Sequence, residues 1–211
     1  MVFDPETNTW SEIETNVTPG RMYGQNLEYY PVGAKVILYG GHLRSPLSRD
    51  YVEEAWYFYP DNSSWVKSSS ANTPHGRYWD SMSFSSVHSS LVVFGGTYGE
   101  GPITETWILS TQNMGWTQLD SNDFPSNRVI SDMVYVDFLE SFLLFGGVNN
   151  NYEHYGDTWK LSPETWEWEE LLPTYSSREA IDDPGMMSGY PVTTILAGMT
   201  VLYLISKRKL G

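Results

Sequence analysis

Short apolar runs recur along the chain, and each of them ends at a pair of glycines. Residues 36 to 41 read VILYGG, residues 91 to 96 read LVVFGG, and residues 142 to 147 read FLLFGG. Each run has the length of a short strand, and its glycines allow the chain to turn where a Cβ would clash. The pattern predicts a buried strand that ends in a turn, three times, about fifty residues apart.

Aligning the three glycine pairs brings further residues into step. A tryptophan follows each pair after 11 to 15 residues, and a second tryptophan comes nine residues later. The repeated markers are Gly40, Gly41, Trp56 and Trp65; Gly95, Gly96, Trp107 and Trp116; and Gly146, Gly147, Trp159 and Trp168. Because these markers keep the same order three times, the chain contains an internal repeat.

Each repeat contains four strand-sized segments. In the second repeat they lie near residues 79–85, 91–94, 105–109 and 116–119, with turn-forming residues between them. Four short strands in a period of about fifty residues are typical of one blade of a β-propeller. The two tryptophans supply large apolar surfaces for packing one blade on the next. The predicted fold class is therefore all-β.

The aromatic-Gly-Gly end of the second strand, followed by two spaced tryptophans, resembles the kelch-repeat family. The resemblance covers residues 1 to about 172. It implies a β-propeller of the galactose oxidase/kelch-like type. The predicted four-stranded blades are residues 19–70, 74–121 and 125–172.

Residues 1–13 are predicted to be the second half of a further blade. The sequence MVFDPETNTW aligns with WKLSPETWEW at residues 159 to 168. Three blades and a half cannot close a propeller, which needs four to eight, so the predicted ring is incomplete. Either preceding blades of a longer protein complete the ring, or several copies of the chain associate to close it.

The last segment differs from the repeats. Residues 174–190 are predicted to be a linker, and residues 191–206 a transmembrane helix that could begin at residue 186. About 20 uncharged residues span roughly 30 Å as a helix, the thickness of a bilayer core. The basic residues in the tail 207–211 favour a cytoplasmic C-terminus and a propeller outside the cell. A cytosolic propeller with a tail anchor is the alternative topology.

Composition excludes several kinds of chemistry. The chain has no cysteine, which excludes disulfides, thiolate catalysis and the Cys-linked tyrosine of copper radical oxidases. Residues 1–206 carry a net charge of −17, which disfavours nucleic acid as a partner. The four histidines lack the spacing of metal-ligand pairs, so we expect no metal, no cofactor and no catalytic residue.

The kelch resemblance also implies a ligand-binding mouth at one end of the central channel. It places Arg21, Arg77 and Arg128, each just before an innermost strand, at that mouth, with Tyr23 and Trp79 as stacking surfaces. Guanidinium groups there would bind a carboxylate or an acidic peptide. Alternatively, each arginine pairs with a carboxylate of the neighbouring blade and only holds the blades together.

These expectations favour a binding module. The sequence predicts a membrane-anchored kelch propeller that binds a protein or a glycan at the cell surface. A carbohydrate-active enzyme whose catalytic residues lie in further blades, and a cytosolic tail-anchored adaptor, are the alternative functions.

Overall fold

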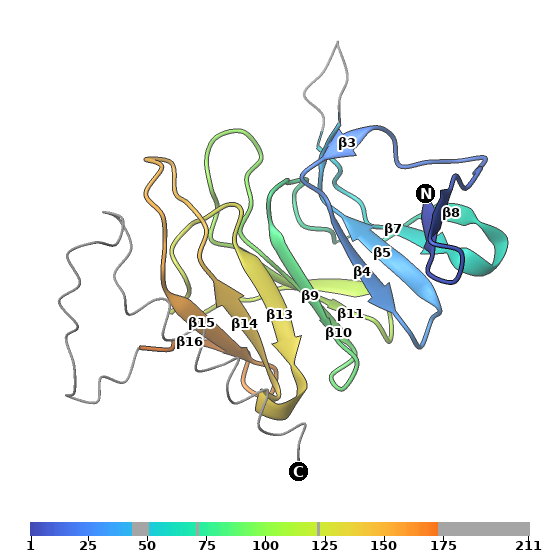
Figure 1. Cartoon of the computed structure of the whole chain (residues 1–211). Coiled ribbons are helices and arrows are strands. Elements are labelled where there is room, and N and C mark those ends of the chain that lie inside the picture. Colours follow the sequence, from blue (N-terminus) through green and yellow to red (C-terminus); the bar gives the residue numbers. More distant parts are fainter. Residues whose placement is uncertain (44–50, 71, 122, 173–211) are drawn as a thin grey trace.

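The computed structural model describes residues 1–43, 51–70, 72–121 and 123–172 (Figure 1). In this part of the chain the regular structure is strands and two short 3-10 helices, Pro60–Asn62 and Asp137–Leu139. The predicted all-β fold class is confirmed.

Three four-stranded antiparallel sheets lie next to one another as blades (Figure 1). Blade 1 contains β4 (Asn26–Tyr30), β5 (Lys35–Tyr39), β7 (Trp56–Tyr59) and β8 (Ser64–Lys67). Blade 2 contains β9 (Ser81–Ser85), β10 (Ser90–Phe94), β11 (Thr106–Ser110) and β12 (Gly115–Gln118). Blade 3 contains β13 (Asp132–Val136), β14 (Ser141–Phe145), β15 (Thr158–Ser162) and β16 (Glu167–Glu170). Each blade contains four strands, the number that the repeat predicts.

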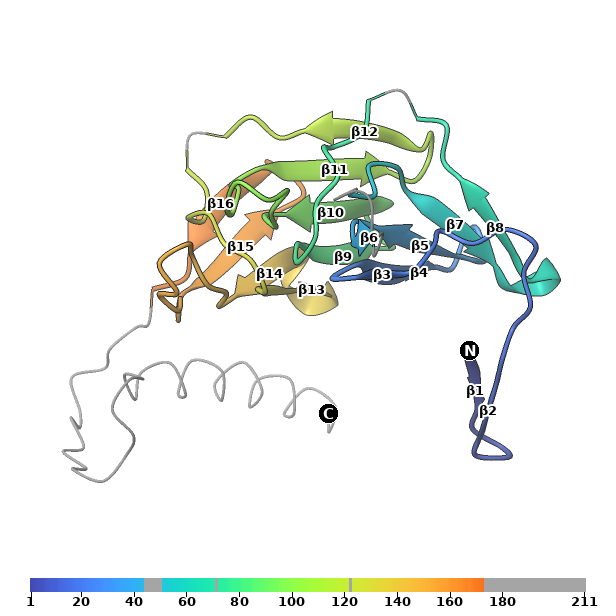
Figure 2. The same ribbon diagram turned by 90° about the horizontal axis from the view of Figure 1, so that it is seen from above.

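Two smaller strand pairs complete the described structure. β1 (Val2–Asp4) pairs with β2 (Thr9–Ser11) in a hairpin that lies apart from the blades (Figure 2). β3 (Met22–Tyr23) pairs with β6 (His42–Leu43) above blade 1. The residues of both strands of the hairpin are exposed. That residues 1–13 form half of a further blade stays a prediction.

The aromatic residue before each glycine pair packs on the next blade. Tyr39 at the end of β5 contacts Trp116 of blade 2, with ring centroids 5.1 Å apart. Phe94 at the end of β10 contacts Trp168 of blade 3 in the same way, at 5.3 Å. Each contact lies within a buried core cluster that joins two neighbouring blades. The repeated aromatic residue and the second repeated tryptophan are therefore two halves of one interface between blades.

The glycines bring the backbones of two blades together. The N–H of Gly41 donates to the carbonyl of Arg77 in the next blade at 2.7 Å, and the N–H of Gly96 donates to the carbonyl of Arg128 at 3.0 Å. A Cβ on the preceding glycine, Gly95, would lie 2.7 Å from the carbonyl oxygen of Arg128. A side chain at that glycine would force the blades apart.

The predicted linker, transmembrane helix and basic tail lie outside the described residues. Within the described ranges, no helix is long and apolar enough to cross a membrane.

Gly95→Ala and Gly146→Ala separate the contact between blades from backbone strain. Both glycines have φ +69°, but a Cβ at Gly146 would meet only the carbonyl oxygen of Tyr155, at 3.6 Å. Each substitution should lower the free energy of unfolding by about 1–2 kcal/mol through left-handed strain. Gly95→Ala should cost at least about 1 kcal/mol more, because the neighbouring blade must move. Urea unfolding followed by tryptophan fluorescence measures both, and equal losses would contradict the interface.

Candidate functional site

Arg77 and Arg128 are fully buried inside their own blades. The Nη2 of Arg77 donates to Glu105 Oε2 at 2.5 Å, and its Nη1 donates to the carbonyl of Gly95 at 3.1 Å. Arg128 binds both carboxylate oxygens of Asp157, at 2.6 and 2.8 Å, and donates to the carbonyl of Gly146 at 2.9 Å. The two guanidinium groups thus connect strands two and three of one blade.

The acidic partners are held in the charged form. Burial alone would raise the pKa of Glu105 and Asp157, but hydrogen bonds from a tryptophan and an arginine outweigh it and lower the pKa of each. The indole N–H groups of Trp107 and Trp159 donate to these carboxylates at 2.9 and 2.7 Å. The first repeated tryptophan therefore positions the carboxylate that neutralises the buried arginine.

Arg21 lies one residue out of step with the other two arginines. In each repeat a proline (Pro19, Pro74 or Pro125) lies seven residues before the first residue of the innermost strand. Arg21 follows its proline by two residues, whereas the other two arginines follow theirs by three. Met22 consequently occupies the position of the buried arginine. Glu54, the counterpart of Glu105, pairs with Lys67 at 2.6 Å. Arg21 itself is exposed.

The expected mouth of three arginines is therefore not what the structure shows. The guanidinium groups of Arg77 and Arg128 are buried and ion-paired, whereas Arg21 is exposed. The partner carboxylates belong to the same blade as each arginine, whereas the alternative prediction placed them on the neighbouring blade. The backbone carbonyl of each arginine binds the neighbouring blade, where it accepts a hydrogen bond from the second glycine of the pair.

The structure does bring together the predicted aromatic residues Tyr23 and Trp79, with ring centroids 6.3 Å apart. They belong to a cluster of five rings where blades 1 and 2 meet: Tyr23, His42, Tyr51, Tyr78 and Trp79. We call this set the mouth cluster. His42 stacks on Tyr23 at 5.1 Å, and Tyr51 stacks on Tyr78 at 5.8 Å.

The mouth cluster combines ring surface open to solvent with a constrained backbone. Tyr23 is 46% exposed and Trp79 is 39% exposed. Trp79 has φ +58°, a left-handed conformation that is uncommon for a large side chain. Its N–H donates to the carbonyl of Gly24 at 2.9 Å, and its carbonyl accepts from the N–H of Ile130 at 3.0 Å. These hydrogen bonds to both neighbouring blades hold the indole in place.

The loops between the second and third strands contribute further groups to the same end of the blades (Figure 1). Tyr98 and Tyr152 are exposed, as are Glu53, Glu100 and Glu153. Tyr51 reaches the next loop, because a Cβ added to Gly99 would collide with its hydroxyl oxygen. Exposed tyrosines and glutamates therefore lie on loops at the same end of the blades as the mouth cluster.

Asp80 is a buried carboxylate that no motif of the sequence predicts. Its Oδ2 accepts from Asn26 Nδ2 at 3.0 Å, while its Oδ1 has no hydrogen-bond partner. Burial raises the pKa of Asp80 to about 7, even though the charge of Arg77 lowers it. Only the packing of blades 1 and 2 excludes water from this side chain, so the sequence contained no signal for it.

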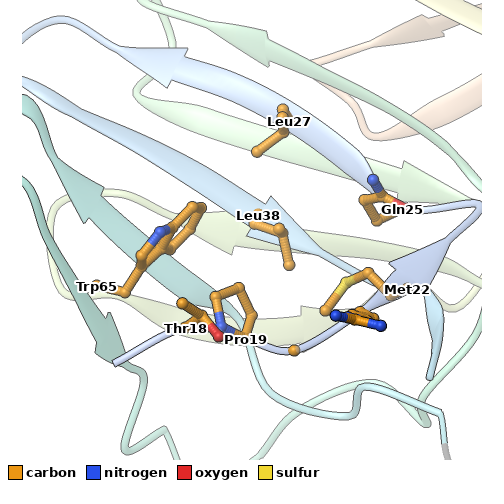
Figure 3. A pocket seen from close by; sticks show the side chains of 9 residues that line it. Thr18, Pro19, Met22, Gln25, Leu27, Leu38 and Trp65 are labelled. Atoms are coloured by element: carbon orange, nitrogen blue, oxygen red, sulfur yellow. The ribbon is translucent and has the colours of Figure 1, made fainter. Parts of the chain in front are cut away.

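A hollow of about 500 Å³ lies on the outer side of blade 1, and Arg21 is among the residues that line it. Figure 3 shows Leu27, Leu38 and Trp65 around it, with Met22 and Pro19 at its edge.

Among the described residues no group of three or more His, Asp or Glu side chains is placed to hold a metal ion.

Asp80 should make the stability of the fold depend on pH. Because its folded pKa is raised, the folded state binds a proton that the unfolded state does not bind between about pH 4 and 7. The contribution of Asp80 to the free energy of unfolding should rise as pH falls from 8 to 5, by a few kcal/mol at most. Asp80→Asn should remove that contribution and stabilise the protein at pH 8. Urea unfolding at pH 5 and pH 8 tests this, and the exposed Asp137→Asn serves as control. If Asp80→Asn showed the same difference in the free energy of unfolding between the two pH values as the wild type, the prediction would be contradicted.

Comparison with known families agrees with this architecture. Residues 1–183 match the KLHDC2/KLHL20/DRC7 Kelch-repeats domain. Kelch domains generally mediate protein interactions, so this part of the chain is a protein-interaction domain. Because this match covers most of the chain, and its described blades repeat the same glycine and tryptophan positions, the chain belongs to this family of kelch-repeat domains.

Proposed function

We propose that the mouth cluster is the surface on which a protein partner docks, and that the partner presents an apolar or aromatic side chain beside basic residues. The observation that carries this proposal is the exposed, conformationally fixed indole of Trp79 within the five-ring cluster. Tryptophan and tyrosine are the residues that most often dominate binding energy at protein interfaces.

The fixed geometry supports binding. The ring of Trp79 packs over Gly24, where an added Cβ would lie 2.9 Å from the indole Cδ1. Tyr78 packs against Trp79 with ring centroids 4.5 Å apart. Because the cluster is already ordered, a ligand would lose little further side-chain entropy on binding.

The charge of the surroundings indicates the class of partner. Burial of Arg77 and Arg128 against Glu105 and Asp157 leaves neither cation available at the mouth. Glu53, Glu100 and Glu153 are exposed on loops at the same end of the blades, and the chain as a whole carries a net charge of −14. Electrostatic complementarity therefore favours a basic segment over the acidic peptide that three free arginines would bind.

Selection from a random peptide library tests this proposal. Peptides that bind the full chain should be enriched in an aromatic or aliphatic anchor next to Lys or Arg, and their affinity should fall as salt rises. Trp79→Ala and Tyr23→Ala should each weaken binding about tenfold or more. Phe138→Ala, an exposed aromatic in the turn at the other end of blade 3, should leave binding unchanged.

Two outcomes would contradict the mouth as the docking surface. Selected peptides rich in Asp and Glu would show that the charge argument fails. Equal binding by wild type and Trp79→Ala, with unchanged thermal melting, would show that the partner docks elsewhere. A glycan ligand is the second candidate, favoured by the exposed ring of Trp79, and a glycan array screened with the same variants separates the two ligand classes.

We also propose that residues 191–206 anchor the protein in a membrane, with the kelch blades on the outer side. The support is the uncharged stretch followed directly by Lys207, Arg208 and Lys209. The full chain should stay with membranes after alkaline carbonate extraction. Leu196→Arg together with Leu202→Arg should release it, because each charge costs about 3 kcal/mol at the bilayer centre. Extraction of the unmodified chain into the supernatant would overturn the anchor.

Protease added outside intact cells then tests the orientation. Digestion of the blades in intact cells supports the outer location. Protection of the blades until the cells are lysed would instead support the cytosolic, tail-anchored arrangement.

A further inference from the structure

The blades use one repeated interface, and the described part of the chain contains one half of that interface at each end without its counterpart. Between blades 1 and 2, and again between blades 2 and 3, the aromatic residue before the glycine pair packs on the tryptophan of the next blade's last strand. The corresponding tryptophan of blade 1 is Trp65, and the corresponding aromatic residue of blade 3 is Phe145.

The first uncovered half lies on the outer side of blade 1. Leu27 on its innermost strand is 57% exposed, whereas the equivalent Met82 and Met133 are each 6% exposed. Tyr29, the next residue along the same face, is also exposed. The hollow lined by Leu27, Leu38 and Trp65 lies on this face (Figure 3). In blades 2 and 3 the equivalent surface is covered by the preceding blade.

The second uncovered half lies on the far side of blade 3. Phe145 is 46% exposed, whereas the equivalent Tyr39 and Phe94 are fully buried. Val134 on the innermost strand of blade 3 is exposed as well. A Cβ at Gly146 would meet no residue of a following blade, in contrast to Gly95. Blade 3 thus offers the aromatic side of the interface, and blade 1 offers the tryptophan side.

Backbone hydrogen bonds between the blades show the same complementarity of the two ends. A chain of hydrogen bonds runs from Ile130 N–H to the carbonyl of Trp79, and from Trp79 N–H to the carbonyl of Gly24. Among the described residues this chain continues neither from Gly24 N–H nor to the carbonyl of Ile130. The donor end therefore belongs to blade 1 and the acceptor end to blade 3, so the two ends are complementary.

We propose that a second copy of this chain covers these faces, blade 3 of each copy docking on the outer side of blade 1 of the other. The contact continues an interface that the chain already forms twice within itself. The described blades of two copies number six, which is within the range of four to eight that closed propellers contain. Because each contact joins different surfaces, it is heterologous, and two such contacts close a ring. The β1–β2 hairpin lies apart from the blades (Figure 2).

Sedimentation equilibrium of the full chain in a density-matched mild detergent tests this proposal. The expected protein mass is twice 24.1 kDa at micromolar concentration. Leu27→Asp and Phe145→Asp each place a charge on one of the two faces, and each should halve the mass. Val87→Asp, in the exposed turn between β9 and β10, carries the same charge change and should keep the mass of the wild type.

Mixing the two face variants distinguishes this contact from other dimers. Leu27→Asp keeps an intact blade 3 face, and Phe145→Asp keeps an intact blade 1 face. The mixture should therefore recover a dimer through one contact, whereas a symmetric contact between like faces would not be recovered by mixing.

Introduced thiols give a second measurement that does not depend on charged variants. The chain has no cysteine of its own. Chains carrying Trp65→Cys and chains carrying Phe145→Cys should form a disulfide-linked pair under mild oxidation only when they are mixed. A wild-type mass of 24.1 kDa, an open series of larger oligomers, or the absence of this disulfide would each overturn the two-copy ring.

Discussion

The carbonyl oxygens of Arg77 and Arg128 are the points at which one blade is fixed to the previous one. Each accepts a hydrogen bond from the second glycine of the preceding blade, at 2.7 and 3.0 Å. The same two arginines direct their guanidinium groups into their own blade, where Glu105 and Asp157 neutralise them. A buried arginine without its carboxylate would leave an uncompensated charge in the core, so the geometry of each blade depends on these ion pairs.

This arrangement also explains the aromatic residue and the two tryptophans of the repeat. The indole N–H of the first tryptophan holds the carboxylate of the ion pair, and the second tryptophan receives the aromatic ring of the previous blade. The glycine pair lets the backbone approach the next blade closely enough for both contacts. Each marker therefore has a separate physical role, within a blade or between blades.

Because Arg77 and Arg128 are buried in ion pairs, the mouth lacks the positive charge that their positions in the sequence suggest. Its described groups are aromatic rings and exposed carboxylates, and the indole of Trp79 is held by hydrogen bonds to both neighbouring blades. Recognition at such a surface would depend on apolar contact and on the charge of the partner. The same regularity leaves Trp65 and Phe145 at the two ends of the arc without the contact that their equivalents make.

The sequence by itself determined the repeat and the four strands of each blade, because periodic apolar residues, glycines and aromatics leave a local signal. It named Tyr23 and Trp79 as stacking surfaces, but only the fold brings their two rings together. It did not determine where the arginines point. Arg77 and Arg128 become buried only because Glu105 and Asp157, nearly thirty residues later, reach them across the folded blade. Arg21 lies one residue closer to its proline than the other two arginines do, and it is exposed instead of buried. Likewise, the raised pKa of Asp80 arises from the exclusion of water between two packed blades, which no local pattern encodes.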